Sequence, residues 1–133
     1  MGEPDHTGFN ALGKGPMPPQ RALECFAVAE TVRRVELESN ELVAKCPVTG
    51  QTDLYRVSIA YRPAGWALET KSLKLYFAAF QQDPDGIFAE HLADRIAADV
   101  ADATSAVDVE VTLVQNVRGG ITTTVTAVRG DRR

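Results

Sequence analysis

The chain has 133 residues and a formal net charge of −4, from 14 Lys and Arg against 18 Asp and Glu. This length fits one domain, and 44% hydrophobic with 24% charged residues is ordinary for a globular protein. No apolar run approaches the roughly 20 residues of a membrane-spanning helix. An acidic chain also lacks the overall basic field that attracts nucleic acid, so neither a membrane protein nor a nucleic-acid binder is expected.

The two cysteines, Cys25 and Cys46, lie in no CxxC or Cys/His spacing, so neither a zinc site nor a disulfide scaffold is expected. Acidic and polar residues stand at the N-terminus, where a signal peptide would have basic and then apolar residues. These features predict a cytoplasmic location and reduced thiols. Residues 1–20, rich in Gly and Pro, predict a flexible tail, and residues 21–133 predict a single domain.

β-Branched and charged residues dominate the segment 31–45, which predicts a hairpin with Ser39-Asn40 as its turn. The Pro- and Gly-containing loop 46–53, CPVTGQTD, follows it. Apolar and polar residues then alternate over LYRVSIAY, residues 54–61, as in a strand with one buried face.

Helical spacing of apolar residues predicts one helix over 69–80 and a second over 87–104. The period changes to two in the last third, which predicts strands over 107–113 and 121–128 joined by an Arg118-Gly119-Gly120 turn. The order ββααββ predicts an α+β fold with an antiparallel sheet covered on one face by helices. Because a small sheet leaves two open edges, we expect a homo-oligomer that covers them.

Cys46 is the strongest candidate for chemistry, because it opens a rigid loop where a thiol can meet a ligand. The neighbouring Lys45 would favour the nucleophilic thiolate. Asp53, at the far end of the loop, could act as a proton donor or acceptor. The alternative is that Cys46 is a small buried hydrophobe and Asp53 a turn residue.

Other residues carry weaker patterns. Lys71 and Lys74 share a helix face and could bind phosphate, and Arg118 with Gly119 and Gly120 could hold an anion, although solvated and turn residues look the same. Glu90 points away from the apolar stripe of its helix and could accept two hydrogen bonds from a guanine-like edge, or could simply be solvated. His91 is interpreted as a surface residue and Cys25 as a packed, inert thiol.

These motifs occur in an order that resembles a known family. CPVTGQTD, then ETKSLKLYFAAF, then GIFAEHLADRI and RGGI resemble the short, single-module 7-cyano-7-deazaguanine reductases, the nitrile reductases of the queuosine pathway. The likeness covers about residues 43–122, and residues 69–76 match that family's signature E-(S/L)-K-(S/A)-hydrophobic-K-(L/Y)-aromatic except at Thr70.

The resemblance implies the tunnelling fold, in which sheets from several subunits close into a barrel with helices outside and active sites between subunits. It implies an NADPH-dependent oxidoreductase in which Cys46 forms a covalent thioimide with the nitrile and Asp53 supplies a proton. By the same resemblance the substrate, a small deazapurine, would be bound by Leu68, Glu69, Thr70 and Glu90. The cofactor NADPH would be bound by Lys71, Arg118 and Gly119, with no metal.

One position departs from the family, which has a histidine directly before the recognition glutamate. Here that position is Ala89, and His91 lies on the other side of Glu90. A shift of two residues turns a helical side chain by about 200°, so His91 does not replace the missing histidine.

Two alternative functions stay open: an amidine-forming enzyme of the archaeosine type, and a non-catalytic deazapurine-binding protein of the same fold.

Overall fold

A computed structural model describes residues 9–13, 15 and 21–130. In this part of the chain the order is β1 (Cys25–Ala27), β2 (Val35–Lys45), β3 (Thr52–Arg62), β4 (Trp66–Leu68), α1 (Thr70–Gln82), α2 (Ala89–Thr104), β5 (Asp108–Arg118) and β6 (Ile121–Gly130). The predicted order of ββααββ is confirmed, with the two short strands β1 and β4 added to it.

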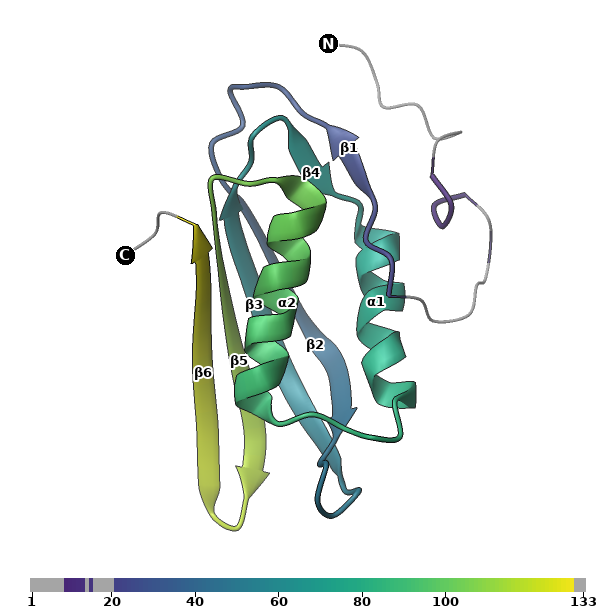
Figure 1. The fold of residues 1–133 in the computed structure, drawn as a ribbon, viewed down its shortest axis with the longest axis vertical. Coiled ribbons are helices and arrows are strands. Elements are labelled where there is room, and N and C mark those ends of the chain that lie inside the picture. The colour runs from purple at the N-terminus through teal and green to yellow at the C-terminus, as the bar shows by residue number, and fades with distance from the viewer. Residues whose placement is uncertain (1–8, 14, 16–20, 131–133) are drawn as a thin grey trace.

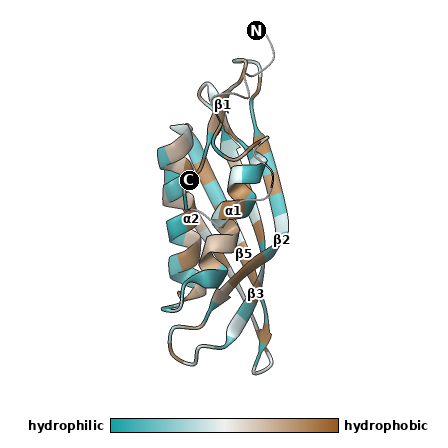
Figure 2. Ribbon diagram, turned by 90° about the vertical axis from the view of Figure 1, so that its right-hand side faces the viewer, coloured by the Kyte–Doolittle hydropathy of each residue, from teal (hydrophilic) through white to brown (hydrophobic). Residues whose placement is uncertain are grey.

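The long strands form one antiparallel sheet in the order β2-β3-β5-β6, so β2 and β6 are its edges. Both helices lie on the same face of this sheet (Figures 1 and 2), which confirms the predicted α+β class. Among the described residues, neither helix is long and apolar enough to cross a membrane.

The core lies between the sheet and the helices, where the alternation read in β3 places its apolar side chains. Tyr55, Val57, Ile59 and Tyr61 are each at most 2% exposed. Val109, Val111 and Leu113 of β5 and Leu92, Ile96 and Val100 of α2 are fully buried against them. Burial of each such side chain stabilises the fold by about 1.5–3 kcal/mol.

Helix α1 begins where Glu69 caps it. The two carboxylate oxygens of Glu69 accept hydrogen bonds from the backbone N–H groups of Lys71 (2.6 Å) and Ser72 (2.8 Å). Such a cap satisfies donors that have no partner inside the helix, and its negative charge suits the positive end of the helix dipole. Glu69 is the first residue of the signature segment 69–76, and its role as the helix cap is a structural reason for a glutamate at this position.

The hairpin expected at Ser39-Asn40 is wrong. β2 continues through these residues, and its pairing with β3 shifts register between Ser39 and Leu42, which is a bulge on an edge strand. Turn-favouring residues fit a bulge as well as a turn, and an edge strand accommodates the extra residues without breaking a second ladder. The first hairpin is instead β2–β3, joined by the loop that begins at Cys46.

Strands β1 and β4 pair with each other, from Cys25↔Leu68 to Ala27↔Trp66, and carry the chain into α1. Three-residue strands contain too little alternation to be recognised in the sequence.

Most of the predicted tail, residues 1–8, 14 and 16–20, lies outside the described residues. Within the described part, Phe9 and Ala11 are buried, and the carboxylate of Glu24 accepts hydrogen bonds from the backbone N–H groups of Asn10 and Ala11.

Candidate active site

The turn between β2 and β3 holds the Cys46 backbone at both its polar groups. The N–H of Cys46 donates to the carbonyl of Gln51 at 2.8 Å, and its carbonyl accepts from the N–H of Gly50 at 2.9 Å. Gly50 has a φ of +71°, which favours glycine and closes the turn. The Cys46 thiol, half-buried, is therefore fixed at the end of a sheet.

The pKa of the Cys46 thiol is lowered to about 7, so a large fraction is thiolate near neutral pH. The main cause is the hydrogen bond from the Thr49 hydroxyl, followed by the backbone N–H groups of Thr49 and Val48 and the side chain of Arg118. Lys45, which the sequence suggested for this role, is not among these groups. The loop itself thus activates the thiol.

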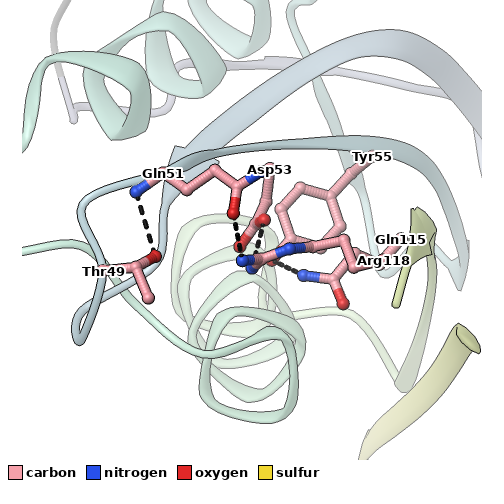
Figure 3. A network of polar contacts seen from close by, with 6 residues as sticks. All are labelled: Thr49, Gln51, Asp53, Tyr55, Gln115 and Arg118. Carbon is pink, nitrogen blue, oxygen red and sulfur yellow. Dashed lines mark hydrogen bonds and ion pairs between the residues drawn. The ribbon is translucent and has the colours of Figure 1, made fainter.

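Asp53 is 4% exposed and forms an ion pair with Arg118, from Nη1 to Oδ1 at 2.6 Å (Figure 3). The second guanidinium nitrogen of Arg118 donates to Oε1 of Gln51, also at 2.6 Å. The interaction with Cys46 is the main reason why the pKa of Arg118 is raised. One guanidinium therefore bonds to the expected acid and to the loop, and it lies near enough to the expected nucleophile for each to shift the pKa of the other.

Tyr55 extends this cluster along β3, and its hydroxyl accepts a hydrogen bond from the side-chain amide of Gln115 at 3.1 Å (Figure 3). Burial first, and then the charge of Asp53, raise the pKa of Tyr55 to about 12. The negative charge of Glu90 adds to this rise, so the exposed Glu90 at the start of α2 lies near the same end of the sheet.

The α1–α2 loop fixes the start of α2 beside Cys46. The N–H of Ile87 donates to the carbonyl of Lys45 at 2.9 Å. Gly86 has a φ of +71°, and a Cβ on it would lie 2.3 Å from the same carbonyl oxygen. Only glycine permits this approach, which sets Glu90 relative to the thiol.

We call Cys46, Asp53, Glu90, Arg118 and Gly119 the thiol cluster. Gly119 and Gly120 form the β5–β6 turn, with φ of +59° and +78°, and nothing lies within 4 Å of where a Cβ of either would be. This backbone is therefore open to a ligand. Within residues 9–13, 15 and 21–130, no group of three or more His, Cys, Asp or Glu side chains could hold a metal ion.

Leu68, Glu69, Thr70 and Lys71 form a second group, which we call the β4–α1 junction. The first three of them line a cavity of about 510 Å³ whose other walls are mostly apolar and include Phe9. The Nζ atom of Lys71 donates to the backbone carbonyl of Gly15. The carboxylate of Glu69 is used by the helix cap, as described above.

Within one chain these two groups lie at opposite ends of the sheet (Figure 1). The loop after α1 reaches the Cys46 end, whereas the junction precedes α1, whose 13 residues span about 20 Å. At the junction, the N–H of Leu68 donates to the hydroxyl of Tyr61, which is near the end of β3 farthest from Asp53. The structure thus brings the residues of the thiol cluster together, but in one chain it leaves the β4–α1 junction far from them.

Ala89, His91 and Cys25 lie outside both the thiol cluster and the β4–α1 junction as defined above. Ala89 is buried in the core, whereas His91 is exposed and its ring faces that of Phe88, with centroids 6.3 Å apart. The thiol of Cys25 donates to the carbonyl of Ala103 at 3.3 Å, and burial raises its pKa, as suits an inert thiol.

Sequence reasoning missed Thr49, Gln51, Tyr55 and Gln115 as parts of this site. Thr49 and Gln51 lie inside the motif already singled out, so a hydroxyl three residues after the cysteine was the available signal. The pairing of Arg118 with Asp53 had no such signal, because 65 residues separate them in the chain.

A family model described as "QueF-like protein" matches residues 52–133. An NADPH-dependent 7-cyano-7-deazaguanine reductase of Frankia casuarinae is 43% identical over 110 residues, covering 83% of this chain and 86% of that protein. A protein of the same name from Anaeromyxobacter sp. is 40% identical, covering 88% of this chain and 96% of that protein. A third, from Syntrophus aciditrophicus, is 41% identical over 82% of this chain and 78% of that protein.

Among solved structures, the apo form of an archaeosine synthase QueF-Like is similar, with a TM-score of 0.69 and 25% sequence identity. The match covers 76% of this chain and 97% of that one. The arrangement of sheet and helices is therefore shared with a protein that differs at three of four aligned residues.

Proposed function

The chain belongs to the QueF-like protein family, and from this membership we propose that it is an NADPH-dependent oxidoreductase that reduces the nitrile of 7-cyano-7-deazaguanine to the aminomethyl group. The reductases from three bacteria match more than four fifths of its length, and their names give this cofactor and this substrate. The amine product would serve queuosine or other 7-deazapurine biosynthesis.

The thiol of Cys46 carries the proposal, because its pKa of about 7 makes it a nucleophile at neutral pH. The Cys46 thiolate would attack the nitrile carbon, forming a C–S bond while one π bond of the C≡N group breaks. The electron pair moves to nitrogen, and the product is a thioimide. A covalent link fixes the carbon at the loop and makes it easier to reduce than a free nitrile.

Asp53 would move the proton that this step needs. It interacts with the same guanidinium as Cys46 does, so both groups lie within reach of Arg118. A proton released from the Cys46 thiol can pass to an Asp53 carboxylate oxygen and then to the nitrile nitrogen. This transfer keeps charge balanced when the C–S bond forms.

When bound, NADPH would supply hydride. Two hydrides and accompanying protons convert the carbon of the nitrile to that of an amine, and the C–S bond to Cys46 breaks, which releases the product and returns the thiol. The ammonium group of Lys71 and the open backbone of the turn at Gly119 suit the phosphates of a dinucleotide. In the structure Arg118 is bonded to Asp53 and Gln51, so a phosphate would compete with these partners for it.

Glu90 would recognise the deazaguanine edge, because an exposed carboxylate beside the thiol can accept two parallel N–H groups. The cavity at the β4–α1 junction supports a role for Leu68, Glu69 and Thr70 in binding the flat ring, since its walls are mostly apolar. Glu90 and this junction lie at different ends of one chain.

This separation supports a homo-oligomer in which the thiol cluster of one copy meets the junction of another. The sheet edges β2 and β6 are open, and the exposed apolar side chains of Val117, Ile121 and Val128 lie at or near the β6 edge. Pairing of such edges between copies would bury them.

Two inactive variants test the shared site. Cys46→Ala removes the thiol and Lys71→Ala changes the junction, so each variant alone should turn over poorly. After unfolding and refolding together, about one quarter of the sites should combine two intact halves and regain activity. No activity above that of the separate variants would contradict an active site shared between copies.

Oxidation of NADPH in the presence of 7-cyano-7-deazaguanine tests the activity itself. Wild-type protein should consume two NADPH per amine formed, and Cys46→Ala should consume none. Cys25→Ala is the matched control, because it removes the other thiol at a distance from the loop. Equal turnover by Cys46→Ala and wild type would overturn the assignment of the nucleophile.

The second candidate is addition of ammonia to give an amidine, and the similarity to an archaeosine synthase favours it. Both reactions begin with the same thioimide at Cys46. They separate when the protein and a nitrile substrate are supplied with ammonia but no NADPH: an amidine product would support the second candidate, whereas product formation only with NADPH would exclude it. A non-catalytic deazapurine binder would give neither product.

A further inference from the structure

Arg118 bonds to both the loop and the carboxylate of the site, close to the thiol. Its Nη1 donates to Asp53 and its Nη2 to Gln51, both at 2.6 Å. The Asp53 side chain is 3% exposed and that of Arg118 is 32% exposed, so water screens this pair less than it screens a surface ion pair.

Gln51 links Arg118 to the backbone of Cys46. Its backbone carbonyl accepts the N–H of Cys46, while its side-chain oxygen accepts from Arg118. Arg118 therefore ties the residue that holds the Cys46 backbone to β5, on the far side of β3. The guanidinium donates from two nitrogens at once, and its positive charge favours negative groups held beside it.

The position of Arg118 depends on an irregularity in β5. The β5–β6 pairing shifts register between Gln115 and Arg118, whereas the β3–β5 pairing extends only to Tyr55↔Gln115. A bulge changes the direction of the side chains that follow it. Arg118 thus reaches past the end of the β3–β5 ladder to the loop that contains Gln51.

We propose that Arg118 is a positioning residue, which holds Asp53 and the Cys46 loop in place and favours the thiolate of Cys46 before substrate arrives. Without the guanidinium, a thiolate beside a buried, unpaired carboxylate is disfavoured. This role differs from binding of a cofactor phosphate, the role that the family resemblance implied for the same residue. It rests on the proposed function only in taking Cys46 as the nucleophile.

Alkylation of Cys46 by iodoacetamide tests this role without nitrile or NADPH, so the result does not depend on whether the proposed reduction occurs. The rate at Cys46, separated from Cys25 by peptide mass, is measured against pH in the full chain. Arg118→Gln should move the midpoint upward by about half a unit to one unit, because loss of a nearby cation disfavours the thiolate. Arg118→Lys should restore most of the shift.

Arg129→Gln is the matched control, since Arg129 also lies on a strand of this hairpin and pairs with a carboxylate, Asp94, at 2.8 Å. Its midpoint should equal that of wild type. An unchanged midpoint in folded Arg118→Gln, or a raised KM for NADPH with no change in the alkylation midpoint, would overturn the proposal. So would a midpoint in Arg118→Lys as high as that in Arg118→Gln.

Gln51→Ala keeps the test decisive if Arg118→Gln does not fold. This variant removes one of the two anchors of the guanidinium without changing any charge. A raised midpoint supports the positioning role, and an unchanged midpoint contradicts it. Circular dichroism of each variant verifies that the comparison is made on folded protein.

Discussion

The thiol of Cys46 should lose much of its activation when the hydroxyl of Thr49 is removed. This hydroxyl is the largest single cause of the lowered pKa, and its oxygen also accepts the N–H of Gln51 at 3.2 Å. Thr49→Val keeps the shape of the side chain and the backbone N–H of residue 49. It therefore removes only the hydroxyl.

A hydrogen bond to the charged form of a thiol favours that form and lowers its pKa by about 1–2 units. Because Thr49 is exposed, water replaces part of this bond, and we expect a rise of about one unit, from about 7 in the wild type. At pH 7 the thiolate fraction would then fall from about one half to about one tenth. The rate of a thiolate reaction at that pH should fall about fivefold.

The pH profile of alkylation at Cys46 measures this change. The rate rises with pH as the thiol ionises, so a raised pKa moves the whole curve to higher pH and leaves its upper plateau in place. Thr49→Ser retains the hydroxyl and should follow the wild-type curve. A Thr49→Val curve that superimposes on that of wild type would refute the idea that the loop activates the thiol.

Three further variants test the other parts of the site. Asp53→Asn should slow turnover by roughly 10²-fold or more, as for loss of a general acid, whereas Asp94→Asn, on the exposed side of α2, should not; equal rates would remove Asp53 from the mechanism. Glu90→Gln should raise the KM for the nitrile about 10- to 100-fold with little change in kcat, and a fall in kcat alone would contradict a recognition role. Gly86→Ala should lower the free energy of unfolding, measured in urea, by about 1–3 kcal/mol more than Gly65→Ala does. Both glycines have a positive φ, but only at Gly86 would a Cβ meet backbone atoms. Equal losses of stability would contradict that close approach.

Local periodicity was sufficient to predict the elements that form the core. The i+4 spacing of Leu92, Ile96 and Val100 predicted the buried face of α2, and these three side chains are fully buried. Phe88, which has the same spacing, is 47% exposed because it precedes the helix as its N-cap. The pattern predicted the helix but not which end residue leaves the core.

Features that depend on distant partners were not predictable in the same way. Ser39-Asn40 has turn chemistry, yet the pairing of β2 with β3 draws these residues into a bulge. Arg118 was assigned to an anion because glycines follow it, and its bond to Asp53 arises only when β5 packs beside β3. Side-chain chemistry indicated which residues matter, whereas the bulge and the strand order determine what each one touches.

Mass spectrometry of the protein mixed with 7-cyano-7-deazaguanine, with no NADPH present, tests the central claim most directly. The account predicts a stable increase in mass equal to the whole nitrile, located on the peptide that contains Cys46 and missing in Cys46→Ala. Unmodified Cys46 in folded wild-type protein at saturating nitrile, or a mass increase located on another residue, would contradict it.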